Sequence, residues 1–241
     1  LSLMSKAMAV TLPLVLLLID YILNRRRDKS MLIDKIPFFI LSFACGLAAI
    51  FAMDPKKVIG ANIPFDLLDK LALAGYSIVF YLYKLLAPIG LTCLYVCHEK
   101  VSLFYLSVIP LLIILFFVCR RSKTVIFGAA FFLITLLPVL KFVPFAGITA
   151  VADRYTYIPS IGLFFIAGTG FVRLYKMSVK YTFFMRATLV VIMSAIIVSL
   201  SLLTSDRCKT WRDELSLWND ATQKGQYDLL TYNNRGAAYL E

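Results

Sequence analysis

The sequence predicts an all-α, polytopic membrane protein that ends in a short soluble helical tail. Of its 241 residues, 61% are apolar and only 16% are charged, and the mean hydropathy is +0.83. Long apolar runs alternate with short basic clusters, and the composition becomes that of a soluble protein after residue 205. Together these observations exclude an ordinary soluble globular domain.

The formal net charge of +11 comes from 25 Lys and Arg against 14 Asp and Glu. Most of the excess basic residues lie in the short connections between apolar runs, where they set the orientation of a protein in the bilayer. They do not form a continuous basic groove, so we do not expect nucleic acid as a partner.

A helix needs about 20 mostly apolar residues to cross a hydrocarbon core about 30 Å thick. Seven segments approach this length. They are residues 7–23, 36–53, 71–89, 101–118, 124–145, 157–174 and 187–203. We expect six of them to be ordinary spans, because prolines such as Pro13, Pro110 and Pro138 are tolerated in membrane helices. The segment 71–89 is the exception.

Orientation follows from three basic clusters, at residues 25–35, 120–123 and 173–186. Clusters of this kind stay in the cytoplasm, so an even number of crossings must separate any two of them. Two clear spans separate the second cluster from the third. Three candidates separate the first from the second, so one of these three does not cross.

The segment 71–89 resolves this parity, since it carries Lys84 and ends at Pro88. A lysine at the centre of the membrane costs about 2.5 to 3.5 kcal/mol on insertion scales. We predict a re-entrant or interfacial helix on the outer side, with Lys84 facing water or a polar cavity. The alternative is an ordinary span whose lysine extends to the nearer interface.

The tail, residues 206–241, contains four residues at helical spacing on one face, which predicts an amphipathic helix. These four are Trp211, Leu215, Trp218 and Thr222.

Further along the tail, Tyr232, Gly236 and Tyr239 have the spacing that opens a tetratricopeptide repeat, although Arg235 stands where that pattern has Leu. We expect Gly236 to allow two helices to approach closely. The alternative is an isolated amphipathic helix on the membrane surface.

Three blocks of residues resemble one membrane family. They are residues 5–13 with Asp20 and Tyr21, residues 81–88 with Leu91 and Tyr95, and residues 152–163. In composition, order and the repeat-like ending, they resemble the transmembrane and tetratricopeptide-repeat O-mannosyltransferase family and its bacterial relatives. The resemblance covers nearly the whole chain, and its most specific block is Ala-Asp-Arg-Tyr-Thr-Tyr-Ile-Pro-Ser-Ile-Gly-Leu at residues 152–163.

The resemblance implies a glycosyltransferase of the C-type integral membrane superfamily. Such an enzyme transfers a sugar, with mannose as one candidate, from a polyprenyl-phosphate carrier to a protein hydroxyl or a glycan on the outer side. Residues 1–205 would then be the C-terminal portion of the membrane domain. Residues 206–241 would be an extracytoplasmic helix and a first repeat, and the repeats would bind the acceptor. The short outer loops favour a bacterial inner membrane over the endoplasmic reticulum.

Proteins of this fold carry their catalytic acidic residue in the first outer loop. We expect that loop to lie upstream of residue 1, so the general base is unknown. Arg154 is the first candidate to hold the lipid phosphate, because its planar guanidinium can grip two phosphate oxygens at once. Asp153 could orient it, and Tyr155 and Tyr157 could contact sugar or lipid. Alternatively, Asp153 and Arg154 form a structural pair and the tyrosines belong to an aromatic belt.

Lys84 and Lys6 are the second and third candidates for substrate binding, and both could instead be interfacial anchors. Asp54, Asp66 and Asp69 could hold a divalent cation beside phosphate. Their spacing fits no metal-binding loop, so solvated carboxylates are favoured and no metal site is predicted. Asp20 is expected to pair with nearby Arg25 and Arg26.

Two other readings of the sequence remain open. An O-antigen ligase or polymerase can share the many-span plan with appended repeats. A non-catalytic membrane scaffold or a transporter could also use its repeats to recruit partners. A transporter tends to have paired broken helices, whereas only one segment here is suspicious.

Overall fold

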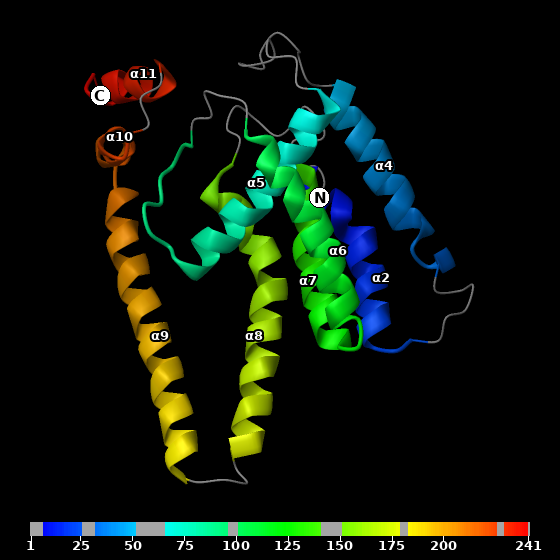
Figure 1. Cartoon of the computed structure of the whole chain (residues 1–241). Coiled ribbons are helices and arrows are strands. Elements are labelled where there is room, and N and C mark those ends of the chain that lie inside the picture. The colour runs from blue at the N-terminus through cyan, green and yellow to red at the C-terminus, as the bar shows by residue number, and fades with distance from the viewer. Residues whose placement is uncertain are drawn as a thin grey trace. The chain divides into compact units, whose positions relative to one another are not determined.

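The computed structural model describes residues 7–25, 32–51, 66–95, 101–140, 151–178, 183–225 and 229–240. Within these ranges every regular element is an α-helix or a 3-10 helix. The predicted all-α fold class is therefore confirmed (Figure 1).

Helices occupy all seven positions at which the sequence has apolar segments, and two more form the tail. The α-helices are α2 (Leu12–Ile22), α4 (Ile36–Phe51), α5 (Leu67–Leu86), α6 (Val108–Cys119), α7 (Lys123–Leu136), α8 (Tyr157–Ser178), α9 (Phe183–Thr210), α10 (Glu214–Gln223) and α11 (Leu229–Ala238). The 3-10 turns are η1 (Ala7–Thr11), η3 (Leu103–Ser107), η4 (Leu137–Val139) and η5 (Asp153–Thr156).

Proline positions explain why several predicted spans are divided into a 3-10 turn and an α-helix. Pro13 and Pro110 lie in the first turns of α2 and α6, where a missing N–H costs little. Pro138 lies in η4, just after α7 ends at Leu136. The prolines thus mark helix boundaries, whereas the sequence analysis placed them inside continuous spans.

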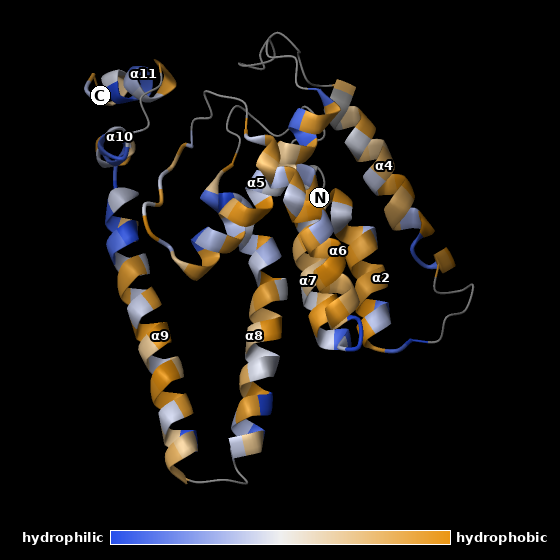
Figure 2. Cartoon of the chain, viewed as in Figure 1, coloured by the Kyte–Doolittle hydropathy of each residue, from blue (hydrophilic) through white to orange (hydrophobic). Residues whose placement is uncertain are grey.

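Two helical segments, Asp153–Ser178 and Phe183–Thr210, are long and apolar enough to cross a membrane. The 28 residues of α9 extend about 42 Å at about 1.5 Å per residue. Among the described residues, four further apolar helices are shorter: Ala9–Ile22, Ile36–Ala48, Leu103–Cys119 and Lys123–Val139. Hydrophobic residues run along α8 and α9, while hydrophilic ones are frequent in α10 and α11 (Figure 2).

The chain divides into two compact units. The first contains residues 1–86 and 97–166, and the second contains residues 87–96 and 167–241. Residues 87–96 therefore group with the last two long helices and the tail rather than with α5, which they directly follow.

In the first unit, α2 packs against α7. Lys123, at the start of α7, donates a hydrogen bond to the Asn24 side chain just after α2. At the opposite end of this pair, η1 contacts η4. The helices are therefore antiparallel, and Arg25 and Lys123, from the first two basic clusters, lie at the same end of the pair.

Beside this end, Asp20 near the end of α2 forms ion pairs with Lys35 and Arg25. Arg25 also pairs with Asp34 at 2.7 Å. Asp20 and Lys35 are both buried, so the pair joins the end of α2 to the start of α4. The expected pairing of Asp20 with Arg25 is confirmed, and Arg26 lies outside the described residues.

Two glycines bring α7 and α8 into backbone contact. A Cβ on Gly162 would overlap the carbonyl oxygen of Gly128, and a Cβ on Gly128 would overlap that of Gly162. Phe127 and Phe165 pack edge to face beside them, with ring centroids 5.1 Å apart. Small residues that let two helices approach this closely are typical of helix pairs in membranes.

The helix α5 is buried on most sides near its middle, because the consecutive residues Ala72, Leu73, Ala74 and Gly75 are all buried. This helix packs against η3. At Gly75 the backbone of Tyr105 comes so close that a Cβ would overlap its carbonyl oxygen.

Candidate functional site

The turn η5 contains Asp153, Arg154 and Tyr155, which belong to the block that carries the most specific part of the family resemblance. It follows the buried residues Val151 and Ala152 and leads directly into α8. Tyr155 N donates to the Ala152 carbonyl at 3.0 Å, and the Thr156 hydroxyl donates to the Asp153 carbonyl at 2.7 Å. These bonds fix the turn, so Arg154 is held at the entrance to a long apolar helix.

Tyr81 of α5 fixes this turn to the rest of the first unit. The backbone N–H of Ala152 donates to the Tyr81 hydroxyl at 3.2 Å, and Tyr81 itself is completely buried. Residues 71 positions apart in sequence are joined by this bond. Tyr81 belongs to a block that carries the family resemblance, but the sequence analysis did not name it as a site residue.

Arg154 is exposed, and its guanidinium lies 5.4 Å from the centroid of the Tyr155 ring. A guanidinium over an aromatic face is held by cation–π attraction and still presents N–H groups at its edge. The ring of Tyr155 is buried, so it serves as a fixed platform. An exposed, positioned guanidinium can bind an anionic oxygen.

The other two residues predicted around Arg154 differ in their surroundings. Tyr157, the first residue of α8, is 77% exposed and could meet a ligand or lipid. Asp153 is half-buried. Of the two tyrosines, Tyr155 therefore supports the turn and Tyr157 is accessible.

Lys84 lies on α5, one helical turn after Tyr81. Its ammonium nitrogen is 5.6 Å from the ring centroid of Phe80 and 5.9 Å from that of Tyr83, and the residue is half-buried. The structure thus places this cation beside two aromatic rings of its own helix, near the end of α5. Lys6, the third predicted cation, lies outside the described residues.

Two of the three carboxylates considered for a divalent cation have a structural role. Asp66 accepts a hydrogen bond from Leu67 N at 2.8 Å, and Asp69 accepts one from Asp66 N at 3.3 Å. The bond from Asp66 N to Asp69 is one half of a capping box, and the two carboxylates together satisfy backbone N–H groups at the start of α5. Asp54 lies outside the described residues, and no group of three or more His, Cys, Asp or Glu in the described ranges could hold a metal.

The second unit has a polar cluster that the sequence analysis missed. Asp220 of α10 pairs with Arg207 of α9 at 2.6 Å and with Lys224 at 2.7 Å, and the Lys224 ammonium also donates to the Leu91 carbonyl at 2.7 Å. The spacing of Asp220 and Lys224 by four residues indicates a helical ion pair. No local pattern indicates that Lys224 also reaches residue 91.

Two titrating groups in this unit have shifted pKa values with clear causes. Hydrogen bonds from the backbone and side chain of Ser216 lower the pKa of Asp213, which caps the N-terminus of α10. Burial raises the pKa of the Cys93 thiol. Asp213 therefore holds its charge to lower pH than a free carboxylate does, and Cys93 is a weaker nucleophile at neutral pH than an exposed thiol.

The two polar clusters have different chemical capacities. The Arg154 turn presents an exposed cation on a rigid support, which suits an anionic ligand. In the second cluster both cations already share the Asp220 carboxylate, which suits a structural contact. The chain matches no model of a known protein family, no curated protein and no solved structure.

Proposed function

We propose that the chain forms part of the membrane domain of a glycosyltransferase that uses a polyprenyl-phosphate-linked sugar. The single observation that carries this proposal is the hydrogen bond from Ala152 N to the Tyr81 hydroxyl. It joins two of the blocks that resemble the O-mannosyltransferase family, although they are far apart in the chain. Residues that serve one site are expected to meet in this way.

In this proposal, the reaction breaks the bond between the anomeric carbon of the sugar and a phosphate oxygen. An acceptor hydroxyl forms the new bond, its proton passes to a base, and the lipid phosphate leaves with the bonding electrons. Arg154 stabilises the charge that develops on the leaving phosphate. Tyr157 contacts sugar or lipid, Asp153 orients the turn, and Lys84 provides a second cation.

The proposed topology has six crossings and one outer helix, α5, that does not cross. Two helices with spanning length and composition support membrane insertion. The basic residues at a common end of α2 and α7 support a cytoplasmic location for that end. The Arg154 turn, α5 and the tail then face the outer side, in a bacterial inner membrane.

Replacement of Arg154 tests the proposal directly. The full-length protein in membranes would be incubated with radiolabelled polyprenyl-phosphate sugars and candidate acceptors. We expect Arg154→Ala to abolish transfer and Arg154→Lys to retain part of it, because lysine keeps the charge without the planar fork. Arg173→Ala is the matched control, since Arg173 is an exposed arginine near the other end of α8.

Insertion and folding must be equal in the three variants for the comparison to hold. Near-normal transfer by Arg154→Ala would remove this residue from the site. Failure of the unaltered protein to transfer sugar from any such carrier would contradict the function itself.

A second candidate function is a membrane scaffold that recruits partners through its tail, and one observation favours it. On α11, Tyr232 and Tyr239 are exposed and Gly236 has open space around its Cα. We propose that this face begins a tetratricopeptide repeat, whether the protein is a glycosyltransferase or a scaffold. The close helix approach expected at Gly236 is not made by any described residue. Unimpaired partner capture by a protein without transferase activity would favour the scaffold.

A further inference from the structure

The nine residues 87–95, which follow α5 directly, belong to the second compact unit. Residues 87–95, here called the strap, contain no regular helix, and they include a turn at Gly90 with a φ of 63°. This left-handed conformation is one that glycine adopts without strain. The strap groups with α9 and the tail rather than with the helix before it.

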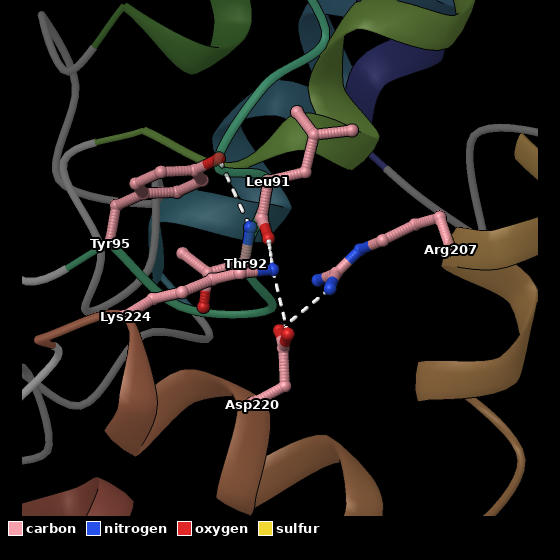
Figure 3. Close-up of polar contacts among 6 residues, drawn as sticks. All are labelled: Leu91, Thr92, Tyr95, Arg207, Asp220 and Lys224. Carbon is pink, nitrogen blue, oxygen red and sulfur yellow. Dashed lines mark hydrogen bonds and ion pairs between the residues drawn. The ribbon is translucent and has the colours of Figure 1, made fainter. Parts of the chain in front are cut away.

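One charged side chain, that of Lys224, contacts the strap, and Asp220 links this lysine to Arg207 of α9 (Figure 3). Lys224 donates to the Leu91 carbonyl at 2.7 Å and pairs with Asp220, which in turn pairs with Arg207. The Asp220 carboxylate lies at the centre and binds one cation from each side. We call these three residues the clamp.

The clamp is largely protected from solvent. The side chains of Arg207, Asp220 and Lys224 retain 18%, 19% and 33% of their exposure. Lys224 caps the C-terminus of α10, and Gly225 follows with a φ of 77°. The negative end of the helix dipole favours the Lys224 ammonium at this position. The turn at Gly225 ends the helix here, and the ammonium reaches the Leu91 carbonyl of the strap.

The strap residues beyond Leu91 are buried when the clamp is closed. Thr92 and Leu94 are almost inaccessible, and Cys93 is half-buried. Thr92 N donates to the Tyr95 hydroxyl at 3.2 Å, which folds the strap onto itself. Residues 92–95 lie in no helix or strand, so we expect their docking to depend on the clamp.

We propose that the clamp and the strap form a releasable latch. When Lys224 leaves the Leu91 carbonyl, the strap separates from the α9–α10 corner and exposes Cys93. The strap is the connection that follows the last residue of α5, Leu86. Release therefore also lets this connection move away from the α9–α10 corner. This device is independent of whether the protein transfers sugar.

The rate at which Cys93 reacts with a neutral alkylating reagent measures the open state, since a protected group reacts only after local opening. Cys208 is exposed and provides an internal reference in the same molecule. The full chain in lipid nanodiscs would be labelled and each cysteine quantified by peptide mass spectrometry. In the unaltered protein we expect Cys93 to react more slowly than Cys208.

Replacing Lys224 should open the latch. We expect Lys224→Met to raise the Cys93 rate by about tenfold or more, because it removes hydrogen bonds made by a charged group. The matched control is Lys209→Met, which removes only an exposed ion pair with Asp206 and should leave the rate unchanged. Higher salt should accelerate Cys93 in the unaltered protein, since ion pairs near the surface are screened.

The salt series needs no substitution, so it tests the latch even if a variant folds poorly. Equal Cys93 rates in Lys224→Met and the unaltered protein would overturn the proposal. So would a Cys93 rate that is as fast as that of Cys208 at low salt, or one that does not respond to salt.

Discussion

At the scale of single residues, the hydroxyl of Tyr81 connects the predicted site to the helix that supports it. It accepts a hydrogen bond from a backbone N–H in a fully buried environment. A buried N–H that loses its acceptor retains the full cost of its desolvation. The position of Arg154 therefore depends on a residue that does not touch the proposed ligand.

Tyr81→Phe should destabilise the first unit by about 1 to 3 kcal/mol, because Ala152 N–H would be left without an acceptor. Tyr83→Phe is the matched control, since Tyr83 is on the same helix and is exposed. The free energy of unfolding in mixed micelles would be compared for the three proteins. Equal stabilities would show that this bond does not hold the turn.

At this scale, the sequence identified a candidate residue only where its role depends on its own side chain and its neighbours in the chain. Arg154 could be named as a candidate from the sequence because it lies in the most specific block of the family resemblance, between two apolar runs on the expected outer side. Tyr81 could not be named, because its role depends on a contact with a residue 71 positions away. The cation–π contact of Arg154 with Tyr155, by contrast, joins neighbours in the chain.

At the scale of elements, paired glycines determine how closely α7 and α8 approach. Gly128 and Gly162 lie at a point where each backbone fills the space that the other side chain would need. Their close contact provides van der Waals packing, which drives helix association in lipid. A larger residue at either position must separate the helices or distort one of them.

We expect Gly162→Ala to destabilise the first unit by about 1 to 3 kcal/mol, the usual cost of overpacking. Gly168→Ala lies on the same helix with open space around it, so it should be neutral or slightly stabilising because alanine favours helix. Thermal unfolding in detergent would compare them. If both substitutions have the same effect, the close approach of α7 and α8 is wrong.

A second element, α10, begins at a charged cap. Asp213 accepts a hydrogen bond from Ser216 N at 2.7 Å, and its pKa is lowered by this contact. The folded state therefore binds a proton more weakly than the unfolded chain does. The contribution of the carboxylate is present above its usual pKa of 3.8 and is lost as the pH falls through the lower folded value.

Asp213→Ala should lower the transition temperature of the tail at pH 7 and remove this acid dependence, since no carboxylate remains to titrate. Both tryptophans of the protein, Trp211 and Trp218, lie in or beside α10, so their fluorescence reports on the tail. The control Asp206→Ala removes only an exposed pair. A tail that responds equally to both substitutions would contradict the capping role.

At the scale of the whole molecule, the main prediction concerns sidedness. The proposed topology keeps α5 on the outer side, so residues near Leu67 and near Lys100 should label from the same face of sealed vesicles. Single cysteines introduced at these two positions, with an impermeant reagent, provide the measurement. Labelling from opposite faces would show that α5 crosses the membrane.

Cleavage of the tail provides an independent test of the same topology. A protease on the outer face should remove residues after α9, because the proposed topology leaves an odd number of crossings after the first basic cluster. Inverted vesicles are the control, and their tails should be protected. Cleavage from the cytoplasmic face alone would reverse the orientation and place Arg154 away from the outer side.

The sequence alone determined that the chain is helical and apolar, because composition and the spacing of apolar runs are local properties that a bilayer constrains strongly. Each apolar run that it identified contains a helix in the described residues, and prolines lie close to where α2, α6 and α7 adjoin 3-10 turns. Helix ends were less predictable, since α9 continues to Thr210 although its apolar core ends earlier.

Only the tertiary structure decided which distant residues meet. The contacts of Ala152 with Tyr81, of Gly128 with Gly162 and of Lys224 with Leu91 each join segments that have no shared sequence pattern. Such contacts depend on how helices pack and where connections run. Local composition sets the elements of this protein, and packing across the chain sets its sites.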